Sequence, residues 1–156
     1  MLDYYYLLPY LGNFGNDTRR KKQRLLKPGA NEGFTSEGFT PVVDLRHDYM
    51  KVGPDSAPDE QIAVFRGPGP DLIATSSPDY ESDYNGFHLW RLQGGKLRDV
   101  TRQALPFPVR DSELAYELPR LGTTIHVFRF SLEPRSRKPA FDLLWRRGRF
   151  VMQRLR

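Results

Sequence analysis

From residue 41 onward the chain consists of short runs of β-branched and aromatic residues separated by turn residues. Runs of this composition, bounded by Gly, Pro, Asn or Asp, predict β-strands. Many of them come in pairs around a short turn, so we expect antiparallel hairpins, and residues 123–130 form the clearest single strand. The paired runs are 41–45 with 49–52, 61–66 with 71–75, 87–92 with 97–101, and 141–146 with 149–153.

Helix signals are confined to two short stretches. Asp17 and Thr18 can accept the free N–H groups of a first helical turn, and Lys27-Pro28-Gly29 supplies a stop. A basic helix is therefore predicted between them. A shorter helix is predicted at 112–118, where Ser112 is the cap and the apolar residues that follow share one side.

The length and the order of these elements predict the fold class. A chain of 156 residues fits one domain, which at this size buries roughly 70% of the surface that its unfolded chain exposes. We expect a single globular domain over 1–156, of the strand-rich α+β class, with antiparallel sheets of successive β-hairpins and an N-terminal basic helix. The helical segment 1–28 should pack on or beside a β-rich body, 40–153.

Composition removes several classes of protein. There is no cysteine, which excludes disulfides, thiolate zinc sites and a cysteine nucleophile but leaves the redox compartment open. The longest uncharged stretch, residues 4–16, is too short and too broken by Pro and Gly to cross a bilayer. We expect a soluble protein without a membrane span. No targeting segment is visible at Met1, although a signal peptide removed from a longer chain would leave none.

Charge is distributed unevenly along the chain. The net charge is +5, with +4 in residues 1–27, +7 in residues 135–156 and −6 between them. Basic ends of this kind suit a polyanion such as nucleic acid, whose bases would stack on a neighbouring aromatic ring, whereas the acidic middle would repel it. The residues expected to bind a polyanion or another partner are Arg19, Arg20, Lys21, Lys22, Arg24, Trp145, Arg146, Arg147 and Arg149.

One acidic loop has the oxygen spacing that calcium prefers. Glu81, Asp83 and Asn85 alternate just before Gly86, as in the first half of a calcium-binding loop. The twelfth position is Leu92 rather than a bidentate Glu, so an ordinary acidic loop with an Asn-Gly turn is the favoured interpretation. We predict no metal and no cofactor.

The histidines are the remaining candidates for chemistry. His88 and His126 lie within predicted strands, and His47 stands beside Asp48 in a predicted turn. No serine lies in a G-x-S-x-G elbow, and no glycine loop has the amide donors of a phosphate cradle. We assign no catalytic residue. A hydrolase built on His47 stays open only if the fold brings a serine and an acid to it.

The two hairpins that contain Trp90 and Trp145 share an aromatic, turn and basic-residue pattern that common hairpin composition explains better than duplication.

Three segments, at 87–106, 116–125 and 141–151, resemble sequence patterns that recur in uncharacterised bacterial proteins, many of them exported or lipid-anchored. The resemblance implies a β-rich domain with hairpin turns at 94–95 and 147–148. It implies no activity, and it slightly favours a periplasmic or exported location over the cytoplasm.

The function that these observations favour is a non-enzymatic binding or interaction domain, with a protein or peptide of the bacterial envelope as its partner. Two alternatives remain. One is binding of nucleic acid or another polyanion through the basic ends, and the other is an unrecognised hydrolase.

Overall fold

The structure is a computed structural model, and it describes residues 1–9, 19–26, 41–52, 60–77, 86–107, 114–131 and 136–155. The helices are α1 (Leu2–Leu7), α2 (Arg19–Leu25) and α3 (Thr101–Ala104), with a 3-10 helix, η1, at Leu45–His47. The strands are β1 (Val42–Asp44), β2 (Tyr49–Val52), β3 (Glu60–Phe65), β4 (Leu72–Ser76), β5 (His88–Gln93), β6 (Lys96–Asp99), β7 (Leu114–Glu117), β8 (Thr124–Ser131), β9 (Ser136–Arg146) and β10 (Arg149–Arg154).

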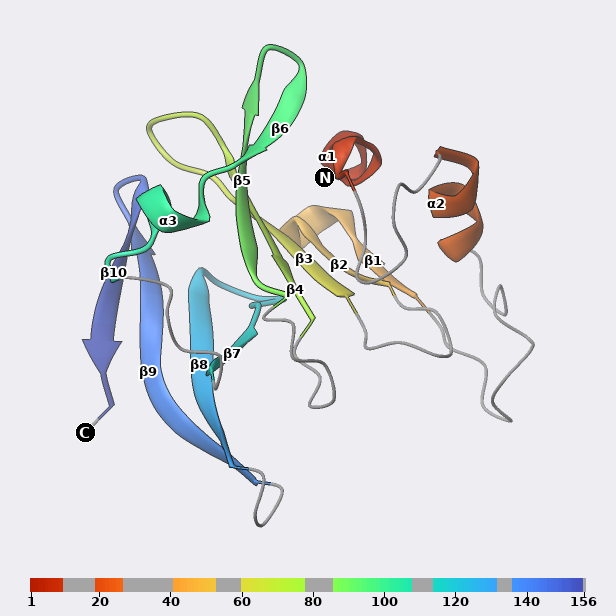
Figure 1. Cartoon of the computed structure of the whole chain (residues 1–156). Coiled ribbons are helices and arrows are strands. Elements are labelled where there is room, and N and C mark those ends of the chain that lie inside the picture. The colour runs from red at the N-terminus through yellow and green to blue at the C-terminus, as the bar shows by residue number, and fades with distance from the viewer. Residues whose placement is uncertain are drawn as a thin grey trace.

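The strands form two antiparallel sheets (Figure 1). A six-stranded sheet has the order β1-β2-β3-β4-β5-β6, and a four-stranded sheet has the order β10-β9-β8-β7. Both orders follow the chain, so hairpins join most neighbouring strands. The predicted fold class, a strand-rich α+β domain of antiparallel hairpins with a short N-terminal helix, is confirmed. No helix in the described part of the chain is long and apolar enough to span a membrane.

The six-stranded sheet is covered on both faces. One face packs against the four-stranded sheet and forms the between-sheet core, which includes Phe65, Leu89, Val127 and Trp145. The other face packs against α1 and forms the helix-side core, which includes Tyr5, Met50, Ile62 and Trp90. Antiparallel sheets often leave one face in water. Here all five residues of β4 are buried, because both faces of that strand are covered.

The two tryptophans lie in different cores. Trp90 of β5 belongs to the helix-side core, whereas Trp145 of β9 belongs to the between-sheet core. The tryptophans of the two similar hairpins are therefore buried on opposite faces of the six-stranded sheet. This difference gives no structural support to a duplicated unit.

Two sequence expectations fail in detail. The helix predicted at 112–118 is wrong, because Leu114–Glu117 is strand β7. Leu114, Tyr116 and Leu118 point into the between-sheet core with the period of two that a strand requires. Thr101, expected to end a strand, instead begins α3. Ser112, the predicted cap, lies outside the described residues.

Candidate functional site

The residues predicted to bind a polyanion lie in two separate places. Figure 1 shows α2 at one end of the molecule and the β9–β10 hairpin at the other. Arg19 and Arg20 of α2 are exposed, and the guanidinium of Arg19 lies 4.6 Å from the centre of the Tyr6 ring. Because the two groups are so far apart, they do not form one continuous basic face.

Lys22 differs from its neighbours on α2, because its side chain is only 1% exposed. Its Nζ donates to the carbonyl oxygens of Tyr5 (3.1 Å), Tyr6 (3.4 Å) and Leu8 at the end of α1. A cation at this position stabilises the negative end of the helix dipole. Lys22 therefore joins α2 to α1 and does not contribute to an exposed basic surface. The side chains of Lys21 and Arg24 lie outside the part of the chain that is described.

Trp145 is buried in the between-sheet core. Its ring lies 5.8 Å from the Phe65 ring and 5.0 Å from the Phe150 ring. Its Nε1 donates to the carbonyl oxygen of Arg66 at 2.7 Å, which joins β9 to the turn after β3. This geometry gives the indole a packing partner on each side and leaves it poorly placed to stack on a base.

Close backbone packing holds the β9–β10 turn beside the β3–β4 turn. A Cβ on Gly67 would lie 3.2 Å from the Cα of Gly148, so glycine at position 67 permits this approach. Arg147 and Gly148 both have positive φ, 50° and 80°, as a tight two-residue hairpin turn requires. The turn predicted at 147–148 is therefore present, and the hydrogen bond from Trp145 lies next to it.

Six arginines lie on the β5–β6 hairpin, α3 and the β9–β10 turn, and Figure 1 shows these three elements on the opposite side of α1 from α2. We call this group the arginine end. Within each hairpin the register places two arginines directly opposite each other, Arg91 opposite Arg98 and Arg146 opposite Arg149. Like charges at directly opposed positions destabilise a sheet. The members of the arginine end are Arg91, Arg98, Arg102, Arg146, Arg147 and Arg149.

Most ion pairs of the described residues form elsewhere in the molecule, and the pair nearest to these arginines joins His88 to Asp99. Arg66 binds Asp48 at 2.6 Å and Asp71 at 2.7 Å, and Arg120 binds Asp44 at 2.9 Å. Two further carboxylates pair with His126 and Arg137. In the described ranges, no carboxylate forms an ion pair with any of the six arginines. The arginine end is therefore a concentration of positive charge whose arginines form no ion pair in that part of the chain, and the neighbouring Asp99 carboxylate binds His88 and Thr101 instead.

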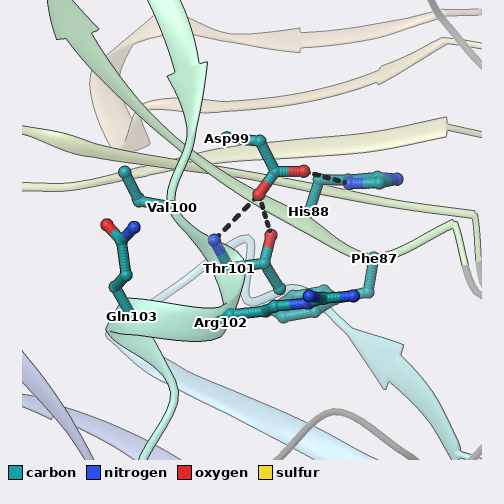
Figure 2. A pocket seen from close by; sticks show the side chains of 7 residues that line it. All are labelled: Phe87, His88, Asp99, Val100, Thr101, Arg102 and Gln103. Atoms are coloured by element: carbon teal, nitrogen blue, oxygen red, sulfur yellow. Dashed lines mark hydrogen bonds and ion pairs between the residues drawn. The ribbon is translucent and has the colours of Figure 1, made fainter.

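A hollow of about 470 Å³ opens beside α3 (Figure 2). Its lining includes Arg102 of the arginine end and three residues joined by hydrogen bonds, His88, Asp99 and Thr101. The Oδ1 of Asp99 accepts from the amide (2.8 Å) and the hydroxyl (2.6 Å) of Thr101. Its Oδ2 lies 2.8 Å from the Nδ1 of His88. The dashed lines of Figure 2 show both sides of this carboxylate in use.

Opposing effects set the pKa of Asp99. Burial by itself would raise it, but the hydrogen bonds from Thr101 and His88 outweigh burial and hold the pKa below its usual range. The carboxylate is therefore ionised near neutral pH and can only accept, so the Nδ1 of His88 is the donor. The hydroxyl of Thr101 also accepts from the amide of Leu89 at 2.9 Å. These bonds attach the start of α3 to β5.

The order of the three side chains argues against acyl-transfer chemistry. In a nucleophile–base–acid triad the imidazole stands between the hydroxyl and the carboxylate. Here the carboxylate stands between them, so His88 cannot take the proton of Thr101 directly. These hydrogen bonds hold the wall of the hollow in place, and they do not activate Thr101 as a nucleophile.

The other two histidines also pair with aspartates through Nδ1. His47 contacts Asp44 at 2.9 Å rather than the adjacent Asp48, whose carboxylate binds Arg66. His126 contacts Asp142 at 2.8 Å across the β8–β9 pair. The arginine Arg120 lowers the pKa of Asp44 through a side-chain hydrogen bond, with His47 adding to the effect against burial. The His47–Asp48 pair that the sequence brought forward for a hydrolase is thus replaced by a His47–Asp44–Arg120 group.

The calcium candidates Glu81, Asp83 and Asn85 lie outside the described residues. Among those that are described, no group of three or more His, Asp or Glu side chains could hold a metal ion. Glu60 is the buried carboxyl in this part, 6% exposed and hydrogen-bonded by the hydroxyl of Ser77. Burial raises its pKa to about 7, despite the opposing effect of Ser77.

Comparison with known proteins finds no match, whether among protein-family models, curated proteins or solved structures. The geometry of this chain therefore carries the functional argument by itself.

Three members of the arginine end, Arg91, Arg98 and Arg102, were not among the predicted site residues. The signal for two of them was present in the sequence. A two-residue turn at Gly94-Gly95 requires that residue 93 pair with 96 and residue 91 with 98, which is the register observed. Counting outward from the turn would have placed Arg91 opposite Arg98. The position of Arg102 could not be predicted without α3, which the sequence did not indicate.

Proposed function

We propose that this protein is a non-catalytic binding domain that takes nucleic acid at the arginine end. The observation that carries the proposal is that two hairpins each place two arginines directly opposite each other across the strands. None of these four arginines has a carboxylate partner among the described residues. Such an arrangement costs stability in the free protein. Phosphates would relieve the repulsion and release counterions from the nucleic acid, which is the main source of affinity for polyanions.

The side chains favour phosphate contacts over stacking of bases. The guanidinium group presents a fork of donors that matches a phosphate and binds it with two hydrogen bonds. The aromatic rings of this region, Phe87, Trp90, Trp145 and Phe150, are all buried. A ligand recognised through its backbone suits this surface better than an unpaired strand whose bases need exposed rings.

The experiment is retention on heparin and binding to labelled DNA over a range of salt concentrations. Arg146→Gln/Arg149→Gln removes one opposed pair, and Arg19→Gln/Arg20→Gln on α2 is the matched control with the same change in charge. We expect the first variant to bind DNA about tenfold more weakly and to show a salt dependence lower by about 1–2 phosphate contacts. The control should remain within about twofold of wild type.

Two outcomes would contradict the proposal. One is a wild-type protein that passes through heparin at low salt, and the other is an equal loss in the two double variants. The second would mean that net charge, not the arginine end, determines the interaction.

A second function, docking of a protein partner, has its own observation. Strand β10 is an outer strand of the four-stranded sheet, and Val151 and Met152 on it are 37% and 42% exposed. An extended peptide can add to such an edge through backbone hydrogen bonds. Arg149 and Arg154, near the ends of β10, would favour acidic residues in that peptide. Met152 stands at a position whose backbone N–H points away from β9, to the open edge of β10. Loss of peptide binding in Met152→Pro, which removes that donor, would separate this function from binding at the arginine end if DNA affinity were retained.

A further inference from the structure

The β5–β6 hairpin has two chemically different faces. Opposed residues share a face, and successive residues along a strand point to opposite faces. Arg91 with Arg98 and Gln93 with Lys96 therefore form a polar, cationic face. Leu92 and Leu97 form the other face, where Leu97 belongs to the helix-side core. The apolar face, through Leu97, anchors the hairpin to the helix-side core. The opposed residues of the cationic face include no carboxylate.

The tip of this hairpin projects from the body. Leu89 and Val100, nearer the base, belong to the between-sheet core and fix the hairpin there. At the tip, Gly94 and Gly95 have φ of 56° and 76°, as a tight turn with two left-handed residues requires. A Cβ on either glycine would have no heavy atom within 4 Å. Figure 1 shows the hairpin extending beyond α3. The turn itself is thus uncovered by other described residues, whereas on the opposite face Leu97 packs into the helix-side core.

Arg91 contains an unsatisfied donor. Its Nε is buried and has no hydrogen-bond partner, although the residue as a whole is only half-buried. An unsatisfied buried donor destabilises the free protein, and an acceptor brought by a ligand would remove that cost. Because the Nε itself is buried, an acceptor of a ligand can reach it only when the Arg91 side chain moves outward.

A two-stranded ribbon fits one nucleic-acid form in particular. The major groove of B-form DNA is about 12 Å wide and admits a β-ribbon, whereas the major groove of A-form RNA is too deep and narrow. Arg and Lys match the acceptors of guanine in that groove, and Gln matches adenine. Arg91, Arg98, Gln93 and Lys96 are residues of these types on one face of the ribbon.

We infer that the cationic face of the β5–β6 hairpin enters the major groove of B-form double-stranded DNA, while Arg102 and the Arg146–Arg149 pair contact the phosphates beside it. This inference rests on the proposed function and adds to it the form of the nucleic acid and the element that reads it. Contacts to base edges come from β5 and β6, and contacts to the backbone come from α3 and the β9–β10 turn.

The first test compares three ligands by fluorescence anisotropy at fixed salt: a 20-base-pair DNA duplex, the RNA duplex of the same sequence, and the single-stranded DNA. Wild type should bind the DNA duplex at least tenfold more tightly than the RNA duplex. Arg91→Gln/Arg98→Gln should bring the DNA duplex to the affinity of the RNA duplex. Arg146→Gln/Arg149→Gln should weaken all three ligands by similar factors. Equal affinity of wild type for the two duplexes, or an unchanged preference in Arg91→Gln/Arg98→Gln, would overturn the inference.

The second test is protection of the DNA from methylation by dimethyl sulfate. Bound protein should protect guanine N7, which lies in the major groove, and Arg91→Gln/Arg98→Gln should lose this protection. Protection confined to adenine N3, in the minor groove, would also overturn the inference. Neither methylation result bears on the proposed function, which retention on heparin tests separately. If wild type fails to bind any nucleic acid, the proposed function fails as well, so the two failures are distinguishable. Because Arg91→Gln/Arg98→Gln removes a like-charge pair, circular dichroism should show that the variant is folded.

Discussion

Tyr5 and Lys22 hold each other through two hydrogen bonds. The hydroxyl of Tyr5 donates to the carbonyl oxygen of Lys22 at 2.9 Å, and the Nζ of Lys22 donates to the carbonyl oxygen of Tyr5 at 3.1 Å. Both side chains are fully or almost fully buried. Since Tyr5 also lies in the helix-side core, this pair connects α2 to the six-stranded sheet through α1.

Removal of the Lys22 ammonium should destabilise the protein. Lys22→Met keeps most of the apolar stem but leaves the carbonyl oxygens at the end of α1 without their donor, at a cost of about 2–3 kcal/mol in the free energy of unfolding. Arg20→Met on the exposed side of α2 is the control and should change stability by no more than about 0.5 kcal/mol. Urea unfolding measures both. Equal small effects would mean that the contact between α1 and α2 contributes little.

Trp145 should be a stability residue and not a ligand-binding residue. Trp145→Phe keeps an aromatic ring between Phe65 and Phe150 but removes the Nε1 donor to Arg66, and we expect a loss of about 1–2 kcal/mol. The affinity of the folded variant for DNA should stay within about twofold of wild type. Thermal unfolding and anisotropy measure the two quantities. A fall in affinity without a fall in stability would instead indicate that the indole contacts the ligand.

The turn around Gly67 should be intolerant of a side chain. In Gly67→Ala the new Cβ would meet the backbone of Gly148 at 3.2 Å, which should separate the two turns and cost about 1 kcal/mol or more. Gly69→Ala, two residues away, is the matched control because a Cβ there has no atom within 4 Å. Gly69→Ala should be neutral or slightly stabilising through the unfolded state. Denaturant midpoints that coincide for the two variants would refute the close approach.

Glu60 should make the protein less stable as the pH rises from about 4.5 to about 7. Its pKa in the folded protein is raised from 4.5 to about 7, so the folded state binds the proton more tightly than the unfolded state. Stability is therefore highest below the unfolded pKa, falls through this window, and stays low above it. The penalty is on the order of 3 kcal/mol.

The test of Glu60 is the pH dependence of unfolding by urea. Glu60→Gln cannot ionise but still accepts from Ser77, so we expect it to gain stability relative to wild type between pH 5 and pH 7. Asp3→Asn, at an exposed carboxyl of α1, is the control and should leave the pH profile unchanged. A constant difference between Glu60→Gln and wild type across this range would show that Glu60 ionises normally.

The sequence predicted elements well where the local pattern agreed with the tertiary structure. The Gly94-Gly95 and Arg147-Gly148 turns were found because positive φ has few residue solutions. Residues 112–118 were misread because a short apolar segment fits a helix and a strand equally well, and the choice was made by the between-sheet core. The burial of Lys22 was not visible, because its acceptors lie 14–17 residues away on α1.

By itself, the sequence determined the strand-rich composition and the two-residue hairpin turns, because these depend on side-chain alternation and turn geometry over a few residues. The tertiary structure alone decided which charges remain available. It buried Lys22 and Trp145, paired Asp48 with Arg66 rather than His47, and brought Arg102 to the same end as two opposed arginine pairs. Those outcomes depend on contacts between segments distant in sequence, and the cost of burying an unpaired charge or donor selects among them.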